Sequence, residues 1–122
     1  LRTISVGFWF GDGMAGAIDF SHVEHYVGGD QGIIRDVLAL FSDQARTVLP
    51  TLDPAGPVDQ WRNAAHSLKG SALGIGAMDL ASACGDAEAA REASVEQKTA
   101  ARVRIADCLG AVLADIAVYT GR

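Results

Sequence analysis

Apolar residues recur at three- and four-residue spacing along most of this chain, and this spacing constrains the fold more than any other feature. Such spacing places side chains on one face of an α-helix. No stretch alternates convincingly with the two-residue period of a β-strand. The pattern therefore predicts an all-α protein. The clearest example contains Ile33, Ile34, Val37, Leu38, Phe41, Ala45, Val48 and Leu49.

Capping residues and helix breakers divide this pattern into separate helices. Asp30 suits the N-cap of one helix, and Ser94 with Gln97 is typical of a capping box for the last. Pro57 suits a first helical position. The linkers are short, so successive helices should be antiparallel neighbours. We expect an antiparallel up-down four-helix bundle with an additional short N-terminal helix. The predicted helices span about 19–27, 30–49, 57–74 and 78–92, with a last one beginning at 94.

Length and charge limit the functions that the chain can have. At 122 residues it suits one small domain. Its formal net charge of -5 argues against nucleic acid, because phosphate binding favours a basic face. No apolar run approaches the ~20 residues needed to span a bilayer. We expect a cytoplasmic monomer with no nucleic-acid or membrane partner.

Residues 1–13 differ from the rest because they mix bulky apolar residues with glycines and show no helical period. One interpretation is a flexible or added segment, with Met14 as the natural start. The other is an arm whose aromatic residues at 8–10 pack onto the bundle. In both cases the helical bundle domain is expected over 14–122.

Two pairs of residues suggest other chemistry, which we do not favour. Cys84 and Cys108 lie far apart in helical apolar patterns, so we interpret them as reduced core residues rather than a disulfide. His22 and His25 share a predicted helix face, but no third ligand is evident. We therefore predict no metal site.

The segment "AAHSLKGSALGIGA" (64–77) places a glycine inside a predicted helix, at a cost of about 1 kcal/mol relative to alanine. Because a helix turns by about 100° per residue, His66 falls on the outer side, away from Leu68 and the core stripe. Lys69 and Gly70 lie within about 60° of His66. A bulky partner approaching His66 would explain the absent side chain at Gly70. The alternative is an exposed histidine and a glycine that have no role.

A longer run around this histidine carries a family resemblance. "AHSLKGSALGIGAMDLASAC" (65–84) resembles the signature of histidine-containing phosphotransfer domains, in which Ala-His-x-Leu-Lys-Gly is followed by a Gly-Ala turn and a second helix. The similarity extends to "AIDF" (17–20), "GGD" (28–30), Phe41 and the helix that reaches Glu88. It covers most of residues 17–119.

The resemblance implies a role for each residue of the motif. His66 would accept a phosphoryl group from a receiver-domain aspartyl phosphate and pass it to another aspartate. Lys69 would be the cation beside that group, and Gly70 would leave clearance for the docking receiver. Some family members have a glutamine on the following helix, where this chain has Glu88, a candidate support whose carboxylate would repel a phosphoryl group. The predicted docking surface consists of Arg62, Ser67, Ser71, Leu73 and Gly74.

Two functions of different classes are compatible with these residues. The first is a phosphorelay intermediate, with response-regulator receivers and a hybrid sensor histidine kinase as partners. The second is a non-phosphorylated helical-bundle adaptor that docks a receiver or kinase, which would not need His66. The chain has no GxxxxGK[ST] loop and is too short for an ATP-binding kinase domain, so we expect no autokinase activity. No cofactor is expected in this chain, and Mg²⁺ is expected on the partner receiver.

Overall fold

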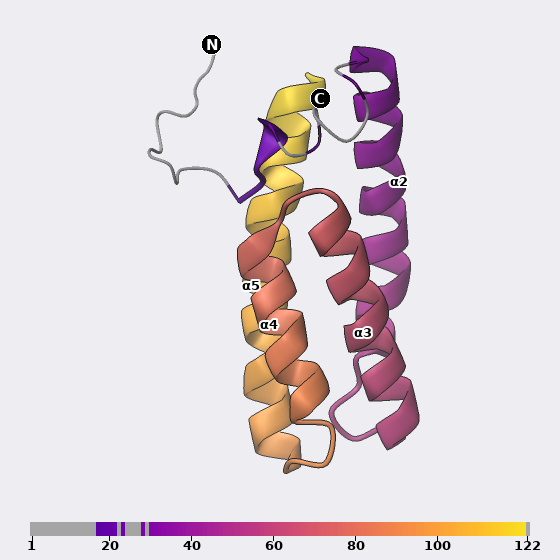
Figure 1. Ribbon diagram of the computed structural model, residues 1–122. Helices are drawn as coiled ribbons and strands as arrows, with labels where there is room; N and C mark the ends of the chain where they lie inside the picture. Colours follow the sequence, from indigo (N-terminus) through magenta and orange to yellow (C-terminus); the bar gives the residue numbers. More distant parts are fainter. Residues whose placement is uncertain (1–16, 22, 24–27, 29, 122) are drawn as a thin grey trace.

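The computed structural model describes residues 17–21, 23, 28 and 30–121. Long helices make up most of this part of the chain, and no residue in it forms a strand. Figure 1 shows the long helices running alternately in opposite directions, side by side. The prediction of an all-α, antiparallel helical bundle is therefore confirmed. The elements are α2 (Gln31–Val48), the 3₁₀ turn η2 (Leu49–Thr51), α3 (Val58–Gly74), α4 (Met78–Ala89) and α5 (Val95–Thr120).

The predicted cap residues start the helices that the sequence assigned to them. The Asp30 side chain accepts a hydrogen bond from the backbone N–H of Ile33 at 3.1 Å. Ser94 and Gln97 form a capping box, in which each side chain accepts from the backbone N–H of the other residue. These contacts satisfy N–H groups that the first turn of a helix cannot pair within the helix. At the far end of α5, Gly121 has a φ of 77° and closes the helix in the left-handed conformation.

The start of α3 and the end of α4 differ from the predicted boundaries. The first helical residue of α3 is Val58, because Pro57 is the N-cap in extended conformation. The last helical residue of α4 is Ala89 rather than residue 92. There the N–H of Ala90 is shared between two carbonyls of the last turn, and Ala93 bonds back to Ala90. This tightening lets the chain turn toward the capping box of α5.

The predicted N-terminal helix is described only in part. Residues 20, 21 and 23 are helical. Asp19 is described and precedes them without helical structure, while the other residues of the predicted helix, including its pair His22 and His25, lie outside the described residues, as does the segment 1–13.

The core lies where the apolar faces of the long helices meet. A stripe of residues along α3 and its C-cap forms part of this core, and each of its side chains is at most 3% exposed. Ile33 departs from the prediction, because its side chain is 46% exposed while Ile34 takes the buried position beside it. The buried α3 stripe consists of Trp61, Ala65, Leu68, Ala72 and Ile75.

The helices α3 and α4 form a hairpin around a short turn at residues 75–77 (Figure 1). A buried hydrogen bond between side chain and backbone holds the two helices together. The Trp61 indole N–H donates to the carbonyl of Ala87 at 2.7 Å. The ammonium of Lys98 on α5 lies 5.2 Å from the centroid of a Trp61 ring. At the other end of the bundle, the Tyr119 hydroxyl donates to Oε1 of Gln31 at 2.6 Å, so α5 is tied to the start of α2.

None of the described helices is both long enough and apolar enough to cross a membrane.

Candidate functional site

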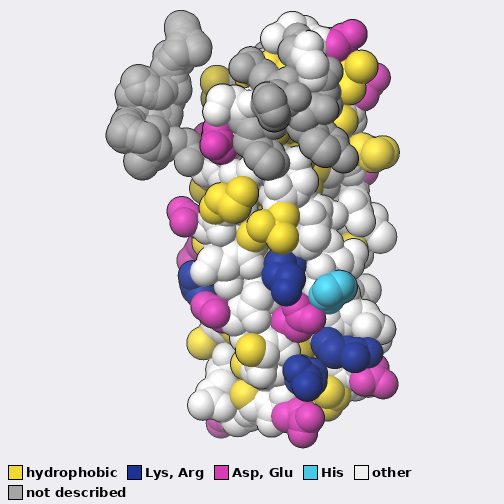
Figure 2. All heavy atoms as spheres, in the orientation of Figure 1, with side chains coloured by type: hydrophobic (Ala, Val, Ile, Leu, Met, Phe, Trp, Pro, Cys, Tyr) yellow, Lys and Arg dark blue, Asp and Glu magenta, His cyan; other side chains and the backbone are white. Residues whose placement is uncertain are grey.

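His66 lies in the middle of α3, on the helix face that points away from the core. Its side chain is 70% exposed, whereas Ala65 and Leu68 on the same helix are at most 1% exposed. The rotation of about 100° per residue separates these faces. Figure 2 shows a histidine at the surface, with an acidic side chain beside it and basic side chains on two sides. The predicted outward direction of His66 is therefore confirmed.

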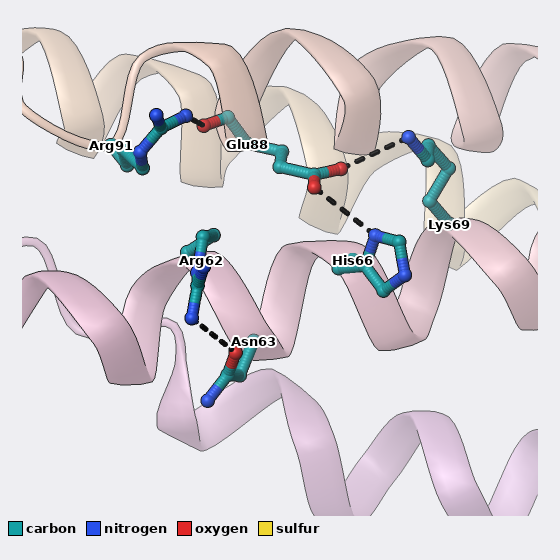
Figure 3. Close-up of polar contacts among 6 residues, drawn as sticks. All are labelled: Arg62, Asn63, His66, Lys69, Glu88 and Arg91. Carbon is teal, nitrogen blue, oxygen red and sulfur yellow. Dashed lines mark hydrogen bonds and ion pairs between the residues drawn. The ribbon is translucent and has the colours of Figure 1, made fainter.

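Glu88 of α4 joins His66 and Lys69 of α3 (Figure 3). One carboxylate oxygen, Oε2, lies 3.1 Å from Nδ1 of His66, and the other, Oε1, lies 3.0 Å from Nζ of Lys69. Because an ionised carboxylate can only accept hydrogen bonds, Nδ1 carries the proton of the neutral ring. The second ring nitrogen, Nε2, then holds a free lone pair and points away from Glu88 in Figure 3. The carboxylate thus faces the Nδ1 side of the ring, which the sequence did not indicate.

Lys69 keeps the Glu88 carboxylate ionised. The Lys69 ammonium lowers the pKa of Glu88 below its ordinary value of 4.5, while partial burial acts in the opposite direction and His66 lowers the pKa further. The Lys69 and Glu88 side chains are 34% and 23% exposed, so solvent screens the ion pair in part. The aliphatic stem of Lys69 runs along α4, where a Cβ added at Gly85 would meet its Cδ at 3.6 Å.

The helix surface one turn beyond His66 is bare. A Cβ added at Gly70 or at Gly74 would meet no described atom of a neighbouring element within 4 Å. Leu73 and Met78 are 45% and 49% exposed, and Figure 2 shows apolar side chains on this face toward the turn that joins α3 and α4. Among the residues that the structure describes, none requires a glycine at position 70, and none covers the apolar area beside it.

Two arginines lie at the opposite end of the site. Figure 3 shows Arg62 and Arg91 on the side of the imidazole away from Lys69. Nη2 of Arg62 donates to Oδ1 of Asn63 at 3.2 Å, and Nη1 of Arg91 donates to the Glu88 carbonyl at 3.5 Å. Both arginine side chains are exposed. The site therefore has a basic flank at one end and an apolar area at the other.

The other residues of the predicted docking surface divide into two groups. Ser67 is exposed next to His66. Ser71 faces α2 instead, where its hydroxyl donates to Oε1 of Gln44 at 3.1 Å, so it lies at the edge of this surface.

The sequence did not identify two exposed residues of the site. Met78 begins α4 next to the apolar area. Arg91 lies in the turn that follows the end of α4. Its spacing of three residues from Glu88 was the signal that both could serve the same face.

The cysteines do not compete with His66 as nucleophiles. Burial raises the pKa of the Cys84 thiol to about 12, and burial also raises the pKa of Cys108. Both are free thiols, with Cys84 buried and Cys108 half-buried, as expected for reduced core residues. Since the thiolate is the reactive form, neither is a reactive group at neutral pH. In the part of the chain that the structure describes, no three His, Cys, Asp or Glu side chains are grouped to hold a metal ion.

The chain is similar to known proteins in sequence and in fold. The model of the Hpt domain family matches residues 36–115. Among solved structures, the chain is similar to the crystal structure of the histidine phosphotransferase ShpA from Caulobacter crescentus, with 40% sequence identity and a TM-score of 0.71. The similarity covers 87% of this chain and 92% of that chain. No curated protein matches the sequence.

Proposed function

This chain belongs to the family of histidine-containing phosphotransfer (Hpt) domains, and on that premise we propose that it relays phosphoryl groups through His66. The histidine takes the group from the aspartyl phosphate of one receiver domain and passes it to the aspartate of another. The observation that carries the proposal is an exposed imidazole whose Nδ1 is engaged by Glu88 and whose Nε2 is open.

The ring geometry suits a nucleophile in phosphoryl transfer. A neutral imidazole nitrogen with a free lone pair needs no activating base at neutral pH. Phosphoryl transfer depends mainly on positioning and on stabilisation of the charge on the transferred oxygens. Lys69 supplies a cation one turn from His66, and its contact with Glu88 still leaves a third of the side chain exposed to an incoming phosphoryl group.

The surface around the ring suits a docking protein. The bare helix at Gly70 and Gly74 allows close approach, while Leu73 and Met78 offer apolar area that a partner can cover. Arg62 and Arg91 would face acidic groups of that partner. Response-regulator receivers, and a hybrid sensor histidine kinase that carries one, are the proposed partners.

The remaining chemistry is assigned to the partner. Mg²⁺ and the second phosphoacceptor would belong to the receiver, and this chain would need neither a cofactor nor ATP. It therefore acts as an intermediate rather than as a kinase.

The test is phosphotransfer from labelled phospho-receivers of the same genome to the wild-type protein and to His66→Gln. The wild type should acquire a label that is labile in acid and stable in alkali, as a phosphoramidate is, and ATP alone should give none. His66→Gln should acquire no label while its melting temperature changes little, because the side chain is exposed.

Two outcomes would contradict the proposal. Label that survives acid, or that persists in His66→Gln, would place the phosphoryl group elsewhere. Receivers that bind both proteins equally and label neither would indicate the adaptor function instead.

A further inference from the structure

Glu88 contacts His66 at Nδ1, and this contact also affects the ring when His66 is phosphorylated at its other nitrogen, Nε2. Oε2 of Glu88 lies 3.1 Å from Nδ1, while Oε1 is held by Lys69 at 3.0 Å. A carboxylate offers only lone pairs, so its contact with Nδ1 is attractive when Nδ1 carries a proton and repulsive when it does not. An ordinary Nε2-phosphohistidine that has lost the Nδ1 proton would therefore place two lone pairs against each other at this contact.

We propose that Glu88 retains the proton on Nδ1 of phosphorylated His66, so that the phosphohistidine of this chain stays in its cationic, readily transferring form at neutral pH. This inference rests on the proposed function in one respect, since it takes Nε2 of His66 as the phosphorylated atom. Glu88 is then a positioning residue that acts through the ring and does not touch the phosphoryl group.

The phosphoryl step balances without any movement of the Nδ1 proton. The lone pair of Nε2 attacks phosphorus, the Nε2–P bond forms, and the aspartyl O–P bond breaks with its electron pair leaving on the carboxylate. The ring becomes cationic, and its Nδ1–H still donates to Glu88. In the onward step the acceptor aspartate forms the new O–P bond, and the Nε2–P electron pair returns to the ring. The leaving group is then neutral imidazole.

The proton matters because it decides the identity of the leaving group. A phosphohistidine without the Nδ1 proton would expel an imidazolate anion, which is a far poorer leaving group. It would have to recover a proton before it could transfer. By holding the proton in place, Glu88 keeps both directions of the relay open without an additional acid.

The charged groups around the ring come from α3, from α4 and from the turn that follows α4. Lys69 and Arg62 belong to α3, Glu88 belongs to α4, and Arg91 lies in that turn. On α2, the uncharged Gln44 contacts Ser71 at the edge of this surface. The three cations disfavour a cationic ring, and among the described residues the carboxylate of Glu88 is the group within hydrogen-bond distance of Nδ1. The retained proton therefore depends on Glu88.

Replacing Glu88 with glutamine gives a sharp test. The amide has a similar size, but it removes the preference for a protonated Nδ1. The amide NH₂ can donate to an unprotonated Nδ1, which favours the neutral phosphohistidine. Potassium phosphoramidate is the probe: Nε2 of His66 displaces ammonia from phosphorus, so no receiver is needed. The ³¹P resonance of phospho-His66 is then followed against pH in the wild type and in Glu88→Gln.

The midpoint of this titration should fall by about one pH unit or more in Glu88→Gln, as expected for loss of a nearby opposite charge. Above the wild-type midpoint, hydrolysis of the label should slow by about tenfold for each unit of that shift. Asp86→Asn is the matched control, because it removes the same charge from the same helix at a carboxylate paired with Arg104 instead. Its midpoint and hydrolysis rate should match the wild type.

A midpoint that is the same in wild type and Glu88→Gln would overturn the proposal. An equal shift in Asp86→Asn would also overturn it, since the effect would then be one of general charge. Failure of receivers to exchange phosphoryl groups with the protein would count against the proposed function alone. The chemically labelled protein would still report on Glu88.

Discussion

The indole N–H of Trp61 lies 2.7 Å from the carbonyl oxygen of Ala87, one residue before Glu88. Trp61 is fully buried, so this hydrogen bond fixes how far α4 is shifted along α3. His66 follows Trp61 by little more than one turn. The bond therefore sets the level at which the Glu88 carboxylate meets the imidazole.

Trp61→Phe should weaken both the fold and the site. The substitution leaves a buried carbonyl with one donor fewer, and such a loss destabilises a protein by about 1–3 kcal/mol. Urea unfolding measures this loss, and phosphotransfer from a labelled receiver should slow as Glu88 loses its fixed position. Phe41→Leu is the comparison, because it shrinks a buried side chain on α2 and leaves α3 and α4 unchanged. The Phe41→Leu protein should lose stability while its rate of phosphotransfer stays unchanged. If phosphotransfer slowed equally in Phe41→Leu, the argument that Trp61 positions Glu88 would fail.

Lys69→Ala should slow phosphotransfer with little effect on stability. The lysine supplies charge at the surface, and solvent screens its partly exposed ion pair with Glu88, so that pair contributes little to stability. Rapid-quench transfer assays and thermal melts separate the two effects. Arg104→Ala serves as control, since it breaks an exposed ion pair with Asp86 on the far side of α4. Transfer that is as fast in Lys69→Ala as in Arg104→Ala would show that Lys69 is only a solvated side chain.

Gly70 substitutions should move stability and function in opposite directions. Gly70→Ala should stabilise the isolated domain by up to about 1 kcal/mol, because alanine favours the helix and the added Cβ meets open space. Gly70→Gln and Gly70→Arg should remain folded while transfer falls with increasing side-chain size. Thermal melts and transfer assays on the same proteins give both quantities.

A second glycine provides the matched control for this series. Gly110 also lies within a helix, α5, and a Cβ added there meets no atom of a neighbouring element within 4 Å. Gly110→Gln should therefore change stability much as Gly70→Gln does and leave transfer intact. Unfolding of the bulky Gly70 variants, or a Gly70→Ala protein that is less stable yet transfers normally, would argue against clearance for a partner.

The ion pair of Glu88 should give the domain a pH-dependent contribution to stability. The pKa of Glu88 is lowered in the folded protein, so the contribution is present above its ordinary value of 4.5 and is lost as pH falls through the folded-state value. In urea unfolding, any advantage of the wild type over Glu88→Gln at pH 7 should shrink below pH 4.5. When both proteins also carry Lys69→Ala, the stability difference between them should decrease less as the pH falls. A difference that stays constant from neutral to acid pH would contradict the argument.

The direction of His66 and the bare surface at Gly70 could be predicted because both depend on one helix alone. The rotation per residue of an α-helix is fixed, so the sequence alone is enough to predict which residues of α3 face outward. The buried stripe that begins at Trp61 follows from the same geometry.

The contact of Glu88 with Nδ1 could not be predicted, because it depends on the axial position of α4 against α3. Apolar spacing specifies which face of α4 is buried, and it leaves the helix free to shift along its neighbour by a turn. The Trp61 contact removes that freedom. Arg91 was missed for a related reason, since α4 ends at Ala89 and the following turn redirects the chain.

The α3–α4 hairpin has a consequence for how the molecule folds. His66 and Glu88 are separated by 22 positions in the chain, whereas Tyr119 and Gln31, which tie α5 to α2, are separated by 88. Closing a loop four times as long costs about 1.2 kcal/mol more in chain entropy, at about 0.6 kcal/mol for each doubling. The contacts of the site are thus the local ones, which favour fast folding, and the long-range tie can form around a hairpin that already holds its histidine and carboxylate together.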